Sequence, residues 1–423
     1  MPTKPDILEF LADVTAGCGP QLQSSGSIRG TLKQRIFEFV RASGHAARTD
    51  VCRALDISPG SATTLTADMI DTGYLREVAS VPREAGRGRP PVALEVVPEA
   101  SYVIGIKLSD EYNTAVLADF AGNVVADCAL PTHPTRRELP ELLNEIGALM
   151  DDLLRKSGKS QDDVKAVGIG VSGIADHKTG VVLWSPLLQL RDVALGPAFT
   201  ERFGLPVYLD NDANMLTLAE LWFGTGRQME NFVVITIEHG VGMGLVVDNR
   251  LYRGAQGIGM ELGHTKVQLD GALCRCGQRG CLEAYLADYA LAREAATALG
   301  RSIDTEQSPQ EMLGHLFEQA KAGNQAAKTI FNRAGRYLSV GLSNVIQLFD
   351  PPLIILSGER MQYDYLYGQE VIAEMQALTL SEGRKPCQVE THAWGDLIWA
   401  RGASALALSS VTDKIFAKDP ISA

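Results

Sequence analysis

The chain has 423 residues, of which 45% are hydrophobic and 21% are charged. This ordinary globular composition excludes wholesale disorder, collagen and a single coiled coil, and the length is enough for about two to four domains. The 39 basic and 51 acidic residues leave a net charge of −12, which argues against nonspecific coating of nucleic acid but leaves room for a small basic module.

The N-terminal region carries no cationic stretch followed by an apolar run, so no signal peptide is predicted. No apolar stretch approaches the ~18–20 residues that cross a bilayer. We therefore expect a cytoplasmic protein with no membrane partner. Its seven cysteines are too few for a disulfide scaffold and are expected to stay reduced, free to bind metal. Residues 1–27, which are rich in Gly, Ser and Gln, are predicted to form a flexible tail.

Three short helices are predicted after this tail, over about 30–43, 46–55 and 59–72. In the first, apolar residues recur at spacings of three and four, the signature of an amphipathic helix. The third has Ser58 at its N-cap and Pro59 at its first helical position, two residue types that favour a helix start.

Two strands follow, over 74–80 and 91–97, and a Gly- and Arg-rich connection joins them. The order helix, helix, turn, helix, hairpin is that of a winged helix-turn-helix, which we assign to residues 28–97. This stretch holds ten basic and eight acidic residues, a net charge of +2 within a chain of −12. A mildly cationic module on an anionic body suits a protein that docks on DNA at one end only.

The residues expected to contact DNA lie on the third helix and on the wing. Small hydroxyl side chains on the helix suit phosphates and base edges, and arginines at a wing tip suit a narrow minor groove. The predicted DNA-binding residues are Ser61, Thr63, Thr64, Thr66, Arg87 and Arg89. The alternative is a helical module that contacts protein, with a merely solvated Arg-Gly loop. The helical order together with the wing favours DNA.

Beyond the hairpin, short strands alternate with helices, which predicts an α/β body. Two lobes, each opening with a β-hairpin sheet, fit the length. We assign the first lobe to residues 98–222, completed by the C-terminal helix at 396–423, and the second lobe to residues 223–395.

One imidazole and three thiols lie within eighteen positions of the second lobe, at His264, Cys274, Cys276 and Cys281. A Cys3His set is a standard tetrahedral complement for zinc. Because no coordination position stays open, we expect one structural Zn2+ ion per chain. Free thiols or a cytosolic disulfide are the alternative, which three cysteines within eight residues disfavour.

The run ELGH followed by CRCGQRGCLE resembles the signature of the ROK family, which groups sugar-responsive repressors with sugar kinases. The resemblance covers about residues 30–410. It implies an actin-like, ribonuclease H-like pair of lobes with a sugar site in the cleft. The expected fold class is therefore α/β: an N-terminal winged helix-turn-helix followed by a two-lobed ROK body with a zinc loop.

The resemblance also implies sugar contacts. The segment LDNDANMLTLAE matches the family's strand-to-helix turn, so Asn211 and Asp212 are expected to contact the sugar, and Asp212 matches the catalytic base of kinase members. Glu261 of ELGH and Glu283 of CLEAY are expected to accept sugar hydroxyls, and His264 is expected to bridge zinc and sugar. Carboxylates and amides suit vicinal hydroxyls. Taken singly, Glu283 also favours a helix N-terminus and Asp212 also suits an N-cap.

Two departures from the family pattern concern the sugar and ATP. Leu187 stands where family members usually have a sugar-contacting Asn, so a plain glucose-type specificity is not expected to transfer. Kinase members have a phosphate loop where this chain has Lys107 and no following Gly pair. In the second phosphate loop, Glu238 and His239 replace Gly and Thr. A glutamate there repels phosphate, so no catalytic residue is expected.

These observations predict a DNA-binding transcriptional regulator of carbohydrate genes, with repression favoured over activation. Its partners are expected to be double-stranded operator DNA, a sugar effector and further copies of the chain in a homodimer or homotetramer. The alternative is an ATP-dependent sugar kinase with an appended DNA-binding domain, which the retained Asp212 keeps open. A third possibility is a catalytically inactive body that binds a protein partner.

Overall fold

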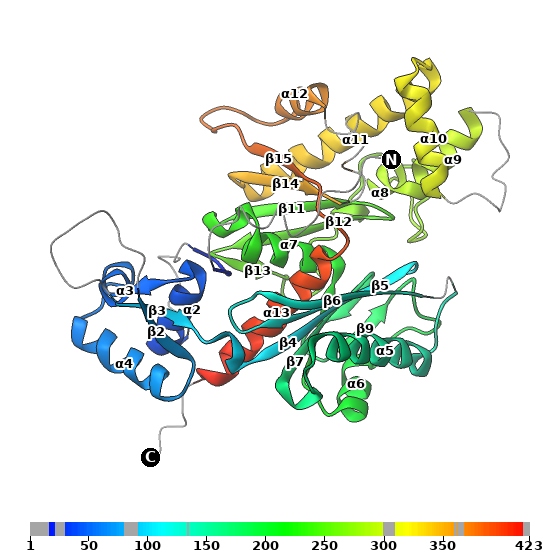
Figure 1. Cartoon of the computed structure of the whole chain (residues 1–423). Helices are drawn as coiled ribbons and strands as arrows, with labels where there is room; N and C mark the ends of the chain where they lie inside the picture. Colours follow the sequence, from blue (N-terminus) through cyan, green and yellow to red (C-terminus); the bar gives the residue numbers. More distant parts are fainter. Residues whose placement is uncertain are drawn as a thin grey trace. The chain divides into compact units, whose positions relative to one another are not determined.

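The computed structural model describes residues 17–21, 30–79, 92–132, 135–298, 309–358, 361 and 368–417 (Figure 1). The chain divides into two compact units. Unit 1 comprises Met1–Glu230, Asp248–Leu251 and Gly395–Ala423, and unit 2 comprises Asn231–Val247 and Tyr252–Trp394.

Unit 1 begins with the predicted helical module. Its helices are α2 (Leu32–Ser43), α3 (Arg48–Leu55) and α4 (Pro59–Asp71). The side chain of Ser58 accepts a hydrogen bond from the amide of Ser61, which confirms Ser58 as the N-cap of α4.

A small sheet completes the module. Strands β1 (Ala46–Ala47), β3 (Val92–Val96) and β2 (Leu75–Ala79) pair in that order, all antiparallel. The expected winged helix-turn-helix order is therefore present in the described residues. The tip of the wing, with Arg87 and Arg89, lies outside them.

The rest of unit 1 is built on a five-stranded sheet. Its order is β10 (Val207–Asn211), β7 (Val164–Val171), β4 (Tyr102–Leu108), β5 (Tyr112–Asp119) and β6 (Val124–Pro131). Strands β10, β7 and β4 run parallel, whereas β5 pairs antiparallel with both β4 and β6. A short hairpin of β8 (Ile174–Asp176) and β9 (Val181–Trp184) follows β7.

Helices cover both faces of this sheet. Ile104 and Ile106 of β4 share a core with α5 (Leu139–Ser157) and α6 (Leu195–Phe203). On the other face, α13 (Ile398–Ile415) lies against Gly105, where a Cβ atom would overlap the carbonyl of Ala400. Helix α7 (Asp212–Phe223) packs against α13 with similar closeness, because Gly402 leaves room for the backbone of Met215. The C-terminal helix thus packs into unit 1 although it begins 175 residues after the end of α7 in the sequence.

Short 3-10 turns join several of these elements. They are η1 (Pro98–Ala100), η2 (Gln161–Asp163) and η3 (Thr225–Gln228) in unit 1 and η4 (Leu262–His264) in unit 2.

Unit 2 contains four strands of a second five-stranded sheet, and the residues of its edge strand β13 (Arg250–Tyr252) are divided between the two units. The order of this sheet is β13, β12 (Val241–Val247), β11 (Phe232–Ile237), β14 (Leu353–Ser357) and β15 (Gln388–His392). The helices are α8 (Glu283–Leu286), α9 (Asp288–Ala298), α10 (Pro309–Lys321), α11 (Gln325–Phe349) and α12 (Gln369–Leu378). Alternate residues of β11, from Val233 to Ile237, share a core with these helices. Among the described residues, no helix is both long and apolar enough to span a bilayer.

Candidate functional site

The four predicted metal ligands come together in unit 2. One ligand atom from each of His264, Cys274, Cys276 and Cys281 lies within 4.8 Å of the others. The Sγ atoms of Cys276 and Cys281 are 3.8 Å apart, and Sγ of Cys274 is 3.7 Å from Nδ1 of His264. We call these four residues the cysteine cluster. They could hold a metal ion, as the sequence predicted.

Tight backbone turns bring these residues together. Gly280 has a φ of +75°, and a Cβ atom there would overlap the carbonyl of Gln268, so only glycine fits. Its amide donates to the carbonyl of Ala272 at 2.9 Å. Burial raises the pKa of the Cys274 thiol, and metal binding at such a cluster requires deprotonated thiols.

Glu283 lies directly beside the cysteine cluster, at the start of α8. Its Oε1 is 3.5 Å from Sγ of Cys274, and its Oε2 accepts from the amide of Val241 at 3.4 Å. The hydroxyl of Tyr289 donates to Oε1 at 3.3 Å and also contacts Sγ of Cys274 at 3.5 Å. One carboxylate is thereby fixed between the cluster and the turn that joins β11 to β12.

Tyr289 was not anticipated from the sequence. Burial raises the pKa of its phenol, and the bond with Cys274 raises it further, so Tyr289 is a neutral donor. The only sequence feature that could have pointed to Tyr289 is its position six residues after Glu283, near the start of α9.

The ELGH segment lies on the same side of unit 2. Glu261 is exposed and precedes the short turn η4, in which the amide of His264 donates to the carbonyl of Glu261 at 3.1 Å. Gly263 packs so closely on β12 that a Cβ atom would overlap the carbonyl of Val241. The three predicted sugar-contacting residues of unit 2, Glu261, His264 and Glu283, are therefore all held near β12 or its preceding turn.

The other two predicted sugar contacts lie in unit 1, where β10 meets α7. The side chain of Asn211 accepts from the amide of Asn214 at 2.8 Å and caps the helix, so the idea that Asp212 is the N-cap is wrong. Asp212 is the first residue of α7, and its Oδ2 accepts from the hydroxyl of Ser172 at 2.8 Å.

The strand register places this pair at a defined edge of the sheet. Asn211 of β10 pairs with Val171 of β7, and Val171 pairs with Leu108 of β4. These three residues end parallel strands, and we call their edge the carboxyl edge. In open parallel sheets, ligands bind at this edge.

Leu187, the expected departure from the family pattern, lies in a loop that contacts the carboxyl edge. Its loop begins at Ser185, which contacts Gly173 immediately after Ser172. The Leu187 side chain is only 4% exposed and belongs to the core of unit 1. Its amide donates to Oγ of Ser185 at 3.1 Å, and its carbonyl accepts from the amide of Arg137 at 2.9 Å. Both backbone polar groups of Leu187 are thus used within the protein.

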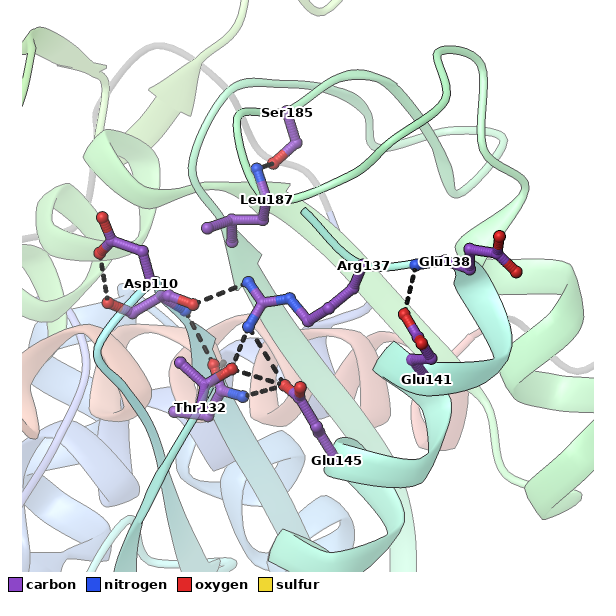
Figure 2. A network of polar contacts seen from close by, with 10 residues as sticks. Asp110, Thr132, Arg137, Glu138, Glu141, Glu145, Ser185 and Leu187 are labelled. Carbon is purple, nitrogen blue, oxygen red and sulfur yellow. Dashed lines mark hydrogen bonds and ion pairs between the residues drawn. The ribbon is translucent and has the colours of Figure 1, made fainter. Parts of the chain in front are cut away.

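Arg137 organises the surroundings of that loop (Figure 2). Its guanidinium is buried, with Nη2 donating to the carbonyl of Ser109 at 2.9 Å and Nη1 paired with Oε2 of Glu145 at 3.2 Å. Asn113 and Thr132 donate to the same carboxylate oxygen at 2.7 and 2.9 Å. This Arg137 network ties the turn after β4, helix α5 and the Leu187 loop together. No local sequence signal indicated it.

The predicted DNA-binding residues separate into two groups on α4. Ser61, Thr63 and Thr64 are exposed. Thr66 is fully buried, and its hydroxyl accepts from Nε of Arg48 at 2.9 Å, so the expectation that Thr66 is exposed is wrong. It lies on the inward face of the helix, where Ala62, Thr66 and Met69 follow one another at spacings of four and three.

The two segments compared with kinase phosphate loops are occupied by other contacts. Nζ of Lys107 lies 3.6 Å from the centroid of the Trp399 ring, a cation–π contact. In unit 2, Nδ1 of His239 is paired with the buried carboxylate of Asp288 at 2.9 Å. The carboxylate of Glu238 lies beside Gly358.

Comparison with known proteins gives the family. The ROK family model matches residues 103–410. The chain belongs to the ROK family, which confirms the resemblance. The xylose repressor of Caldicellulosiruptor bescii is 27% identical over 76% of this chain and 81% of its own length. The repressor Mlc of Escherichia coli is 27% identical over 78% and 81%, and the dual regulator NagC of the same species is 25% identical over 83% and 86%.

Two solved structures share this fold but cover different shares of the chain. A ROK transcriptional regulator described as a homolog of E. coli Mlc has a TM-score of 0.75, with 24% identity, and covers 91% of this chain and 96% of its own. A ROK glucokinase from Streptomyces griseus, solved with glucose and AMPPNP, has a TM-score of 0.62 and 29% identity. The match includes 100% of the kinase chain but covers only 73% of this chain. The regulator-like ROK structure therefore accounts for more of the chain than the kinase does.

Proposed function

We propose that this ROK protein is a transcriptional repressor of carbohydrate genes, whose N-terminal module binds operator DNA and whose ROK body binds a sugar effector. The observation that carries the proposal is the union of a winged helix-turn-helix order and a ROK body in one chain. The two repressors and the dual regulator named above match 76–83% of the chain, which supports it.

DNA binding is assigned to α4 and the wing. Ser61, Thr63 and Thr64 present hydroxyl groups on the exposed face of α4, where they suit phosphates and base edges. One module of this size makes few base contacts, so we infer that a homodimer or homotetramer binds a two-fold-symmetric operator.

Effector binding is assigned to Asn211 and Asp212 at the carboxyl edge of unit 1 and to Glu261, His264 and Glu283 in unit 2. Each set combines acceptors and donors of the kind that bind sugar hydroxyls. Leu187 offers no free polar group in its loop, so we infer an effector whose recognition does not depend on an amide at that position.

The cysteine cluster fits zinc. At a Zn–S distance of about 2.3 Å, tetrahedral geometry places two sulfurs roughly 3.8 Å apart, and the Cys276–Cys281 separation is 3.8 Å. A Cys3His complement leaves no open position, so the bound ion would supply structure rather than reaction chemistry. Its role would be to fix the loop against which Tyr289 and Cys274 hold Glu283.

A sugar kinase with an appended DNA-binding module is the second candidate, and Asp212 is the observation that favours it. Against it, the segments compared with kinase phosphate loops carry the Lys107–Trp399 contact, the carboxylate of Glu238 beside Gly358 and the His239–Asp288 pair. Carboxylates at those places repel phosphate. A coupled ADP-release assay on a panel of sugars decides this: turnover would establish the kinase.

The repressor proposal is tested by selecting genomic DNA fragments with the purified protein at near-physiological salt and then adding sugars. Enrichment of a two-fold-symmetric site that one sugar releases is the expected result. Binding that only follows salt concentration, with no enriched site, would overturn the proposal.

A further inference from the structure

A short piece of the N-terminal region lies packed inside unit 1. Residues 17–21, which fall in the stretch expected to be a flexible tail, form backbone hydrogen bonds to three different elements. The amide of Cys18 donates to the carbonyl of Arg41 on α2 at 3.1 Å, and that of Gly19 donates to Trp222 on α7 at 2.9 Å. The amide of Gln21 donates to Arg227 on η3 at 2.8 Å. We call residues 17–21 the N-terminal strap.

Side chains lock the strap in place. The Cys18 side chain is 3% exposed, and its Sγ donates to the carbonyl of Ala121 at 3.1 Å. Arg227 is buried, and its Nε donates back to the carbonyl of Gly19 at 3.0 Å. The same guanidinium donates to the carbonyl of Ala42, at the end of α2, at 2.6 Å. The strap and Arg227 therefore hold α2 and the end of α7 jointly.

Arg41 makes a second, independent connection between the module and the body. Its buried guanidinium lies 4.6 Å from the centroid of the Trp222 ring and donates to Oγ1 of Thr412 on α13 at 2.9 Å. Nearby, Gln34 of α2 donates to Asp413 at 2.7 Å. Cations are favourable beside the last turn of a helix, where the carbonyl ends of the backbone dipoles gather, which suits Arg41 to the end of α7.

Helix α7 connects this region to the carboxyl edge. It begins at Asp212, whose carboxylate bonds Ser172, and ends at Phe223, one residue beyond Trp222. Every residue from Ala213 to Phe223 is buried, so the helix is held along its whole length. Twelve residues span about 18 Å. A shift at one end of such a packed helix is carried to the other, because close-packed interiors do not deform freely.

We propose that the N-terminal strap, Arg41, Trp222 and Arg227 form a joint that transmits effector occupancy at the start of α7 to the DNA-binding module. The proposal rests on the proposed function, since the input is a sugar at Asp212 and the output is operator affinity. The joint makes the module and the sheet of unit 1 move as one body. Coupling of this kind changes affinity by about 5–150-fold and is reciprocal between the two ligands.

Two glycines of the strap provide a matched pair of variants. Gly17 and Gly19 have similar positive φ values of +93° and +99°. A Cβ atom at Gly17 would overlap the carbonyl of Arg41 and the amide of Gly44, whereas one at Gly19 meets nothing within 4 Å. Gly17→Ala therefore pushes the strap off α2, and Gly19→Ala imposes the same backbone strain without the clash.

A second pair tests Arg41 directly. Arg41→Met removes the charge and the bond to Thr412 but keeps an apolar side chain over Trp222. The hydroxyl of Thr412 still donates to the carbonyl of Leu408 at 2.7 Å, so no buried donor is orphaned. Arg202→Met is the control, because Arg202 also stacks on an aromatic ring, Phe203, but is exposed on α6.

The experiment measures two quantities in the full-length wild type and all four variants. The first is the affinity for the genomic fragment that the wild type selects, with and without D-xylose, D-glucose or N-acetyl-D-glucosamine, each tested separately. The second is amide hydrogen exchange of α2 compared with β4, which needs no sugar. We expect sugar to change operator affinity at least 5-fold in the wild type, Gly19→Ala and Arg202→Met, and less than 2-fold in Gly17→Ala and Arg41→Met.

In those two variants we also expect α2 amides to exchange at least tenfold faster, while β4 is unchanged. Full sugar response in both Gly17→Ala and Arg41→Met would overturn the joint while leaving the repressor intact. If no sugar or fragment acts on the wild type, the proposed function has failed. The comparison of amide hydrogen exchange in α2 and β4 then still tests the joint. Unchanged protection of the α2 amides in both variants would refute it.

Discussion

The cysteine cluster of unit 2 and the carboxyl edge of unit 1 are built in opposite ways. The cluster draws its four ligand residues from eighteen consecutive positions, folded back by tight turns such as that at Gly280. The carboxyl edge draws on β4, β7, β10 and the Leu187 loop, and the buried Arg137 network braces its surroundings. A site made from one segment depends on its ligand atoms, whereas a site made from several depends on packing between distant residues.

The largest effect is expected from breaking the cysteine cluster. Cys281→Ser removes a buried ligand, and structural zinc contributes about 10–16 kcal/mol to the folding of small zinc domains at neutral pH. We expect the wild type to carry one zinc per chain and the variant to carry none, with faster hydrogen exchange from 265 to 282. Cys387→Ser, a half-buried thiol outside the cluster, is the control. Full zinc content in Cys281→Ser would show that the cluster is not the metal site.

In unit 1, the corresponding variant is Arg137→Met, which disrupts the Arg137 network beside the carboxyl edge. Removing one partner of a buried ion pair costs about 3–5 kcal/mol, and the Glu145 side chain is 24% exposed, so we expect a loss of about 2–3 kcal/mol in urea unfolding. Arg155→Met, on the helix that carries Glu145 and paired with Asp152 at the surface, should change stability by less than about 1 kcal/mol. Equal effects of the two variants would mean that the Arg137 network does not brace the edge.

Glu283→Gln removes the carboxylate that is expected to bind sugar but leaves the zinc ligands of the neighbouring loop unchanged. A hydrogen bond to a charged group is worth about 1.5–3 kcal/mol, so we expect sugar affinity to fall roughly 10- to 150-fold while zinc content and operator affinity stay at wild-type levels. Isothermal titration with the responsive sugar measures it. Glu294→Gln, paired with Arg333 on the surface of the same unit, should bind sugar normally. Wild-type affinity in Glu283→Gln would remove Glu283 from the effector site.

The smallest effect concerns the pH dependence of unit 1. Burial raises the pKa of Cys128 from 9.0 to about 11, because the thiolate is poorly solvated in the core. The neutral thiol therefore contributes stability that is complete below pH 9 and is lost as pH rises from 9 to 11. We expect this to cost about 2 kcal/mol by pH 11. Cys128→Ala should flatten that part of the stability profile, and an unchanged slope would contradict the assignment.

The sequence predicted those parts of the molecule that depend on local pattern. Capping residues such as Ser58 and the spacing of apolar residues set where helices begin and which side faces inward. The four ligands of the cysteine cluster were predictable for the same reason, because short loops bring nearby residues together. The departure at Leu187 was also visible, although the burial of its side chain was not.

Only the tertiary structure decided which polar residues are buried and with what they pair. Thr66 lies on a helix of mixed polarity, and its buried hydroxyl accepts a hydrogen bond from Arg48, eighteen residues earlier. Arg137 and Arg227 are buried arginines with no local signal, and Cys18 lies in a stretch whose composition suggested a tail. The side chains of Cys18 and Arg227 bond residues more than 100 positions away in the chain, and Arg137 bonds the carbonyl of Ser109, 28 positions before it. Burial is a property of the assembled core, and short-range periodicity carries no information on which distant segment will cover a given side chain.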